Sequence, residues 1–332
     1  MENSNGKIKI TYREALNQSL HEALQNDERV FLMGEGLGRY GGAFAVSKEL
    51  LQEFGEERIM DVPPSQAGFA GAGIGAAMAG MKPIIGVMSA TFSVLAMDQI
   101  VNNAATLRHL SGGQFHAPMV IRIACGINGQ LGVQNSHSWE AFYAHIPGLI
   151  VLSAGTHKDA RCMLHAALQS QNPVVLFEYT AMLNMEEEIL ADMGTVDISK
   201  AKVLREGTAL SIITYGTGVH KCLDAAAELA STGIDAEVID LRILRPLDEK
   251  TVLASVAKTH RVLVVEEAWR SVSISSEISA RIMEKGFHDL DVPVQRLCGV
   301  EAPIPYSPHL KEAAIPQKND IVNVVKKMIR HD

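Results

Sequence analysis

The sequence predicts an α/β protein of two domains, each built on a sheet covered by helices. The chain has 332 residues, about twice the usual ~150 residues of one domain. Short apolar runs alternate along it with longer segments in which apolar residues recur at helical spacing. The short runs are apolar on both faces, as in parallel strands buried between two layers of helices.

The first domain is predicted to begin with a helix over Tyr12–Asn26, because Leu16, Leu20 and Leu24 recur at helical spacing. The apolar run that follows predicts a buried strand over Arg29–Met33. By the same criteria we expect further helices over 46–54, 69–81 and 93–110, and further strands over 58–61, 83–88, 119–123, 150–153 and 174–178.

Residues 186–203 are predicted to link the two domains, because Met182–Lys200 is acidic and has no convincing period. The first domain is therefore expected over 1–185 and the second, smaller one over 204–332. In the second domain we expect strands over 210–215, 236–240, 261–266 and 292–297, and helices over 220–231, 248–257, 275–284 and 319–330.

Composition excludes several classes of protein. The net charge is −8 and no dense basic run occurs, so nucleic acid is not an expected partner. The longest uncharged stretches, 67–81 and 83–97, have 15 residues each, fewer than the ~18 of a membrane span. The four cysteines lie far apart, so no zinc site, other metal site or disulfide framework is expected. With no targeting segment recognisable over Met1–Tyr12, a cytoplasmic location is expected.

Candidate site residues follow several of the predicted strands of the first domain. Carboxyl ends of parallel strands meet at one edge of a sheet, where ligands bind in open α/β folds. The same residue types are also typical of solvent-facing loops, and that alternative stays open at this point. The candidates are Glu35, Pro64, Gln66, Phe92 and the run 134–137, which includes Asn135 and His137.

The Gly/Ala-rich stretch Gly71–Gly80 lacks the spacing of a dinucleotide-binding motif. Its small residues are expected instead to let helices pack closely, since glycine has no Cβ to hold two backbones apart.

Several motifs taken together resemble one family over nearly the whole chain. It is the beta subunit of the thiamine-diphosphate-dependent decarboxylase component of 2-oxoacid dehydrogenase complexes, nearest to the pyruvate dehydrogenase type. The matching segments are 30–35 (VFLMGE), 40–44 (YGGAF), 68–71 (GFAG), 75–80 (GAAMAG), 97–100 (MDQI), 111–113 (SGG), 145–149 (HIPGL), 172–175 (NPVV), 240–242 (DLR) and 315–317 (IPQ).

The resemblance implies a transketolase-like pyrimidine-binding domain followed by a transketolase C-terminal domain. It implies thiamine diphosphate as cofactor, a 2-oxoacid as substrate and lipoamide as acyl acceptor, with a lipoyl acyltransferase core as a further partner. The family's Gly-Asp-Gly motif, which holds the diphosphate and Mg²⁺, lies on a separate alpha subunit, and this chain has no Gly-Asp-Gly. An α₂β₂ assembly with a shared cofactor is therefore expected.

At the cofactor, the resemblance makes Phe92 the aromatic residue against the aminopyrimidine ring and Glu35 the acidic residue near it. Pro64 is expected beside the same pocket. The family's essential glutamate, which exchanges a proton with the ring, falls on Gln66. An amide can hydrogen-bond the ring nitrogen but cannot exchange a proton with it near pH 7.

A second departure lies in the family's Gln-His-Ser pattern, whose histidine aligns with Asn135. Asparagine keeps hydrogen-bonding capacity but has no titratable imidazole. His137 stands two places further on, and in an extended segment it would project to the same side. It is therefore a candidate replacement.

The sequence supports three hypotheses about the function. The first is a working beta subunit that decarboxylates a 2-oxoacid together with an alpha subunit. The second is a structural or regulatory paralogue that assembles without activating the cofactor, suggested by Gln66 and Asn135. The third is a thiamine enzyme with a changed reaction, such as acyloin formation or ketose use. Product analysis over a broad set of 2-oxoacids and ketoses would distinguish the third from the others.

Overall fold

The structure is a computed structural model that describes residues 6–127, 131–191 and 194–330. The first residues of the chain and two residues of the predicted linker, 192 and 193, lie outside this description. The chain divides into two compact units, Met1–Cys125 with Phe142–Ile198 and Gly126–Ala141 with Ser199–Asp332. Each contains a largely parallel sheet and helices, which confirms the predicted α/β class.

Six strands of the first unit lie side by side in the order β6-β7-β5-β4-β2-β3, and each neighbouring pair is parallel. Their carboxyl ends therefore meet at one edge, as expected. The strands are β2 (Val30–Gly34), β3 (Ile59–Asp61), β4 (Lys82–Val87), β5 (Val120–Cys125), β6 (Ile150–Ser153) and β7 (Val174–Tyr179).

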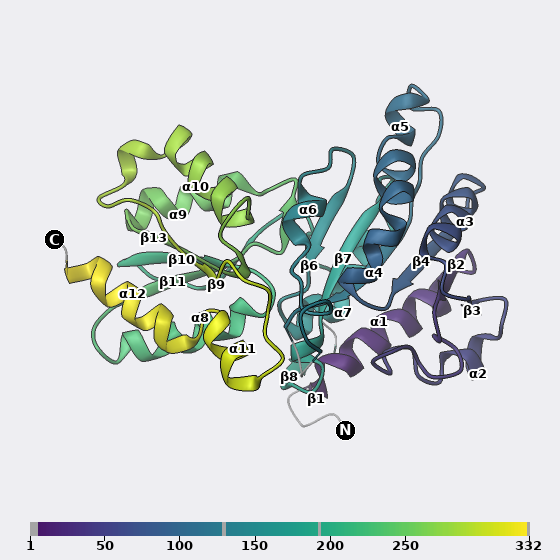
Figure 1. The fold of residues 1–332 in the computed structure, drawn as a ribbon, viewed down its shortest axis with the longest axis horizontal. Coiled ribbons are helices and arrows are strands. Elements are labelled where there is room, and N and C mark those ends of the chain that lie inside the picture. Colours follow the sequence, from purple (N-terminus) through teal and green to yellow (C-terminus); the bar gives the residue numbers. More distant parts are fainter. Residues whose placement is uncertain (1–5, 128–130, 192–193, 331–332) are drawn as a thin grey trace. The chain divides into compact units, whose positions relative to one another are not determined.

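The helices associated with this sheet are α1 (Tyr12–Asn26), α2 (Leu50–Phe54), α3 (Gln66–Met78), α4 (Ala90–Ser93), α5 (Leu107–Leu110), α6 (Glu140–Ala144) and α7 (His157–Ala167). Thr11 begins α1 with a reciprocal capping box to Glu14. Helices α1 and α7 pack against each other, while α3 packs on β4 (Figure 1).

Two predicted helices differ from the structure. The helix expected over 93–110 is broken into a 3₁₀ turn (Val94–Ala96), a π-helix (Gln99–Ala104) and α5. The helix expected over 46–54 is confined to α2, since Glu49 has a positive φ of 71° directly before it. By contrast, α3 begins three residues earlier than predicted, so Gln66 is its first residue.

The predicted linker is not irregular at its start. Residues 186–190 form β8 (Glu186–Leu190), which pairs antiparallel with β1 (Lys7–Thr11). The buried imidazole of His157 secures this pair to α7, because its Nδ1 lies 2.8 Å from Glu187 Oε2 and its Nε2 lies 2.8 Å from the Met185 carbonyl. The acidic run that hid the strand from pattern analysis consists of three consecutive exposed glutamates on a two-stranded ribbon.

The second unit has five strands in the order β14-β13-β10-β11-β9, all parallel except the β9–β11 pair. Helices α8 and α12 pack together on one side of this sheet, with α9 and α10 on the other (Figure 1). The elements are β9 (Lys202–Arg205), β10 (Leu210–Thr214), α8 (Gly218–Ala230), β11 (Ala236–Asp240), β12 (Ile243–Arg245), α9 (Glu249–Thr259), β13 (Val262–Trp269), α10 (Ile274–Lys285), β14 (Gln295–Gly299), α11 (Pro308–Ala314) and α12 (Lys318–Arg330).

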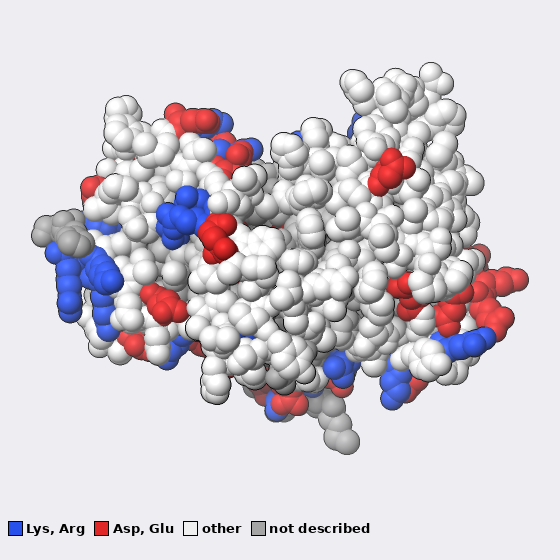
Figure 2. All heavy atoms as spheres, in the orientation of Figure 1, with Lys and Arg blue, Asp and Glu red and all other residues white. Residues whose placement is uncertain are grey.

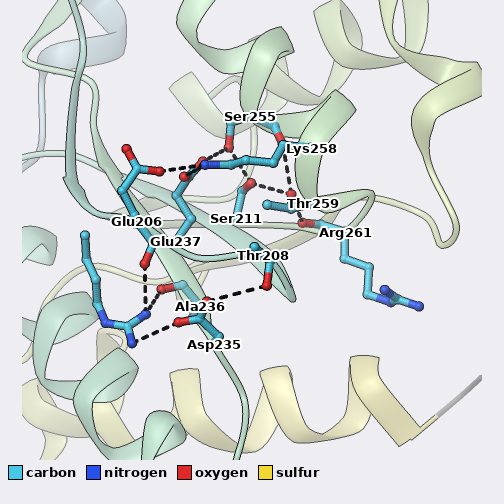
Figure 3. A network of polar contacts seen from close by, with 11 residues as sticks. Glu206, Thr208, Ser211, Asp235, Ala236, Glu237, Ser255, Lys258, Thr259 and Arg261 are labelled. Atoms are coloured by element: carbon cyan, nitrogen blue, oxygen red, sulfur yellow. Dashed lines mark hydrogen bonds and ion pairs between the residues drawn. The ribbon is translucent and has the colours of Figure 1, made fainter.

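A polar network closes the amino-terminal edge of this second sheet (Figure 3). Glu237 is fully buried on β11, and its carboxylate is matched by Lys258 and Ser255 from α9. Ser211 on β10 joins the network through the Ser255 and Thr259 hydroxyls. Because a buried carboxylate is tolerated only when it is paired and hydrogen-bonded, this network is structural.

The segment Gly126–Ala141 follows β5 in the sequence but packs with the second unit. Ile127 forms a small buried cluster with Ile304, Ala314 and Ile315. The second unit therefore supports the segment that contains Asn135 and His137. No helix within the described residues is long and apolar enough to cross a membrane.

Candidate functional site

The candidate site begins with a contact between two residues predicted to share one sheet edge. Glu35 follows β2 directly, and Gln66 begins α3 after β3, the parallel neighbour of β2. Gln66 is 3% exposed, and its Nε2 donates a hydrogen bond of 3.0 Å to Glu35 Oε1. The sheet thus brings together two side chains that are 31 positions apart.

The loop after β2 is fixed by contacts with its neighbours. Asp61, at the end of β3, accepts hydrogen bonds from the backbone N–H groups of Gly38 (2.7 Å) and Arg39 (3.0 Å). Gly34 lies so close to β4 that a Cβ there would be 2.4 Å from the Gly86 carbonyl oxygen. Glu35 therefore stands on a backbone held from two sides.

One oxygen of Glu35 has no partner within the described part of the chain. Its Oε2 is buried and accepts no hydrogen bond, although Oε1 is held by Gln66. A buried carboxylate oxygen without a donor is costly, so this atom marks a place where a ligand donor would be favourable.

A cavity of about 50 Å³ adjoins Glu35. It is lined by an ion pair that the sequence analysis did not predict. Arg122 on β5 makes two parallel hydrogen bonds of 2.6 Å to the Glu178 carboxylate on β7, and both side chains are 7% exposed. A signal was available, since each is the lone charge in an otherwise apolar strand. Buried charges are seldom found without a partner. A lone charge in one buried strand therefore predicts an ion pair with an opposite charge on another strand of the same sheet.

The other predicted residues are less closely tied to this contact. Pro64 is exposed, just before α3, and Phe92 is half-buried on α4 after β4. Asn135 and His137 belong to the segment that packs with the second unit. The expectation of an extended segment there is wrong at Asn135, because residues 132–135 form a turn, and Ser136 Oγ donates to the Gly132 carbonyl at 2.8 Å.

Comparisons with known proteins define first the class of the chain. Residues 8–185 match the transketolase pyrimidine binding domain and residues 199–321 match the transketolase C-terminal domain. A solved structure titled split gene transketolase, inactive beta4 tetramer, is 20% identical with a TM-score of 0.80, over 97% of this chain and 98% of that one. The fold is thus that of a two-domain transketolase-type chain.

Curated relatives then define the particular family. The beta-1 subunit of the mitochondrial pyruvate dehydrogenase E1 component of Arabidopsis thaliana is 42% identical over 97% of this chain and 90% of its own length. The corresponding beta subunit of Homo sapiens is 40% identical over 97% of this chain and 91% of its own. The chain therefore belongs to the family of pyruvate dehydrogenase E1 beta subunits, which confirms the resemblance.

The expected cytoplasmic location is contradicted by these relatives. The subunits of Arabidopsis thaliana, Dictyostelium discoideum and Homo sapiens are all named as mitochondrial. Widely spaced cysteines argue only against a disulfide framework, so they do not distinguish one reducing compartment from another.

The ion pair gives a first prediction. Arg122→Met leaves the buried Glu178 carboxylate without its partner, so we expect the free energy of unfolding to fall by about 3–5 kcal/mol. The double variant Arg122→Met, Glu178→Leu removes both charges and should regain most of that loss. Urea unfolding of the three proteins measures this, and equal losses in both variants would contradict it.

A second prediction concerns Gln66→Glu, which places two carboxyl groups at the 3.0 Å contact. Like charges and burial both raise the pKa of the introduced carboxyl above its usual ~4.3. The folded state then binds more protons than the unfolded one, so stability relative to the native chain should fall as the pH rises from about 4 through the raised pKa.

The matched control is Glu35→Gln with Gln66→Glu, which exchanges the amide and the carboxylate and leaves one charge. Urea unfolding between pH 4 and pH 8 should show the extra pH dependence in the single variant only. The same pH profile in the single variant and the native chain would refute this account of the contact.

Proposed function

We propose that this chain is the pyrimidine-facing subunit of a thiamine-diphosphate-dependent enzyme that decarboxylates a 2-oxoacid together with an alpha subunit. The observation that carries the proposal is the hydrogen bond from the buried Gln66 to the half-buried Glu35 at the carboxyl edge of the sheet. The names of the relatives, which are E1 beta subunits of pyruvate dehydrogenase, favour pyruvate as substrate and lipoamide as acyl acceptor.

The residues present fit the cofactor's aminopyrimidine. The unpartnered Oε2 of Glu35 is an acceptor for a ring amino group, and Gln66 places an amide beside it. Phe92 would lie against the ring, with Pro64 at the rim. When bound, thiamine diphosphate supplies a nucleophilic carbon and an electron sink for the loss of CO₂ from a 2-oxoacid.

Gln66 would orient the Glu35 carboxylate and the cofactor's ring, but it would not exchange a proton with either. Its N–H donates to Glu35, so the carboxylate is held without sharing a proton. An amide has neither a proton to give nor a lone pair basic enough to take one near pH 7. Proton exchange at the ring must then come from another group, and Gln66 serves as a positioning residue.

Two features support a partner chain. Without Gly-Asp-Gly, this chain has no recognisable motif for the diphosphate and Mg²⁺, which we assign to an alpha subunit in an α₂β₂ assembly. The part of the first unit formed by α3, α4 and α5 carries few charges (Figure 2) and exposes large apolar side chains, as protein interfaces do. These are Met78, Val94, Leu95, Leu110 and Phe115.

A second candidate function is a subunit that assembles and holds the cofactor without activating it. The specific observation in its favour is that Gln66, which the resemblance aligns with the family's proton-exchanging glutamate, donates one amide N–H to Glu35. Asn135 points the same way, because it replaces an imidazole with an amide.

Reconstitution tests the first candidate. The chain, co-expressed with a Gly-Asp-Gly-containing alpha subunit and supplied with thiamine diphosphate and Mg²⁺, should release CO₂ from pyruvate or a branched 2-oxoacid at about 1–10³ per second. A stable complex that binds thiamine diphosphate but turns over no 2-oxoacid would reject the first candidate in favour of the second.

The double variant Gln66→Glu, Asn135→His separates the two candidates further. If the native chain lacks a proton-exchanging group, the variant complex should gain ~10²–10⁴-fold in the rate of CO₂ release. Asn135→Gln is the control, since it changes the side chain at the same position without adding a titratable group. An unchanged or lower rate in the double variant would count against the second candidate.

A further inference from the structure

The imidazole of His137 lies between two tryptophan rings in the second unit. Its centroid is 5.6 Å from that of Trp139, at an interplanar angle of 74°, and 5.4 Å from that of Trp269, at 60°. Aromatic rings at these distances and angles attract each other by about 0.5–1.5 kcal/mol per pair beyond the area they bury. We call His137, Trp139 and Trp269 the aromatic clamp.

Trp269 is the fixed member of the clamp. It ends β13, where it pairs with Gly299 of β14, and its indole Nε1 donates a hydrogen bond of 2.9 Å to the Ala302 carbonyl. Trp139 and His137 both belong to the segment 126–141. The contact with Trp269 therefore ties that segment to a strand of the second sheet.

Other contacts support the same segment from the same side. A Cβ added at Gly132 would lie 3.8 Å from the ring of Tyr306, and Ile127 packs against Ile304 and Ile315. These contacts hold the first part of the segment, whereas the aromatic clamp holds the part that carries His137.

We propose that Trp269 is a positioning residue that fixes the segment carrying Asn135 and His137 by clamping the His137 ring against Trp139. The inference rests on the proposed function for its catalytic consequence, but the clamp itself is a property of this chain. Trp269 lies about 130 positions further along the sequence than the residues it positions.

His137 is also partly shielded from solvent. Its Nδ1 is buried with no hydrogen-bond partner within the described residues, and burial lowers its pKa below the ordinary value of 6.5. No charged group adds to this shift. The charged residues on the surrounding elements are Glu140 on α6, Glu266 and Glu267 on β13, Arg270 after β13 and Glu301 before α11. Glu267 forms an ion pair with Lys221. Glu301 accepts a hydrogen bond from the Ser271 N–H.

The chain contains its own reporter of this arrangement, because Trp139 and Trp269 are its two tryptophans. A protonated imidazole in contact with an indole quenches its fluorescence, whereas a neutral one does so weakly. The intrinsic fluorescence of the full chain should therefore rise with pH through one transition whose midpoint lies below about 6.5. His137→Gln should abolish it, and a transition that persists in this variant overturns the proposal.

Three further variants test the positioning itself. Trp269→Phe keeps a flat ring against His137 and should leave the midpoint near the native value, with Trp139 as reporter. Trp269→Leu opens the clamp, so the midpoint should move up toward about 6.5 and the quenching of Trp139 should weaken. His165→Gln is the control, since burial also lowers the pKa of His165, which lies on α7 of the first unit rather than in the aromatic clamp; its profile should match that of the native chain.

Equal midpoints and amplitudes in Trp269→Phe and Trp269→Leu would overturn the proposal. If Trp269→Leu lacks the native circular dichroism, the His137→Gln comparison still decides the matter. In the complex with the alpha subunit, Trp269→Leu should lower kcat by up to ~10²-fold at a near-native KM, and Trp269→Phe should restore it. A complex without turnover would reject the proposed function and leave the fluorescence result standing.

Discussion

The parallel pairing of β2 with β3 and β4 is the constraint on which the candidate site depends. Because all three strands run in one direction, the chain leaves each of them at the same edge, and residues from separate loops converge there. Glu35 reaches that edge from β2 and Gln66 from the turn after β3. Their 3.0 Å contact is formed by the topology of the sheet and does not require a ligand.

That contact also places only one charge at the sheet edge, whereas two carboxyl groups there would repel each other when both are ionised. An amide donor satisfies one oxygen of Glu35 at any pH at which the carboxylate is ionised, so the chain buries a single charge there. Nearby, Arg122 and Glu178 bury two charges that cancel. Glu35, Arg122 and Glu178 thus line one cavity, and the unsatisfied Oε2 of Glu35 is where a ligand donor would be favourable.

Much of this arrangement was predictable from the sequence, and the parts that were not have physical reasons. The strands of the first unit are short apolar runs that alternate with helical segments, so the sequence predicts their positions and their parallel pairing but not their order in the sheet. Strand β8 was not predicted, because three of its residues are glutamates whose side chains face solvent on a ribbon of two strands. The sequence also did not predict that His137 and Ile127 pack with the second unit, because this packing depends on contacts with Trp269 and Ile304, which are far away in the sequence.

The two departures from the family pattern differ in what they preserve. At the position that the resemblance aligns with the family's glutamate, Gln66 has the same number of heavy atoms as glutamate and donates to Glu35, but it has no proton to exchange near pH 7. Two residues beyond Asn135, His137 supplies an imidazole, and its ring contacts Trp269 from another part of the chain. Under the proposed function, holding the cofactor and moving protons would depend on different parts of this chain: the first on the sheet edge at Glu35 and Gln66, and the second on where the aromatic clamp places His137.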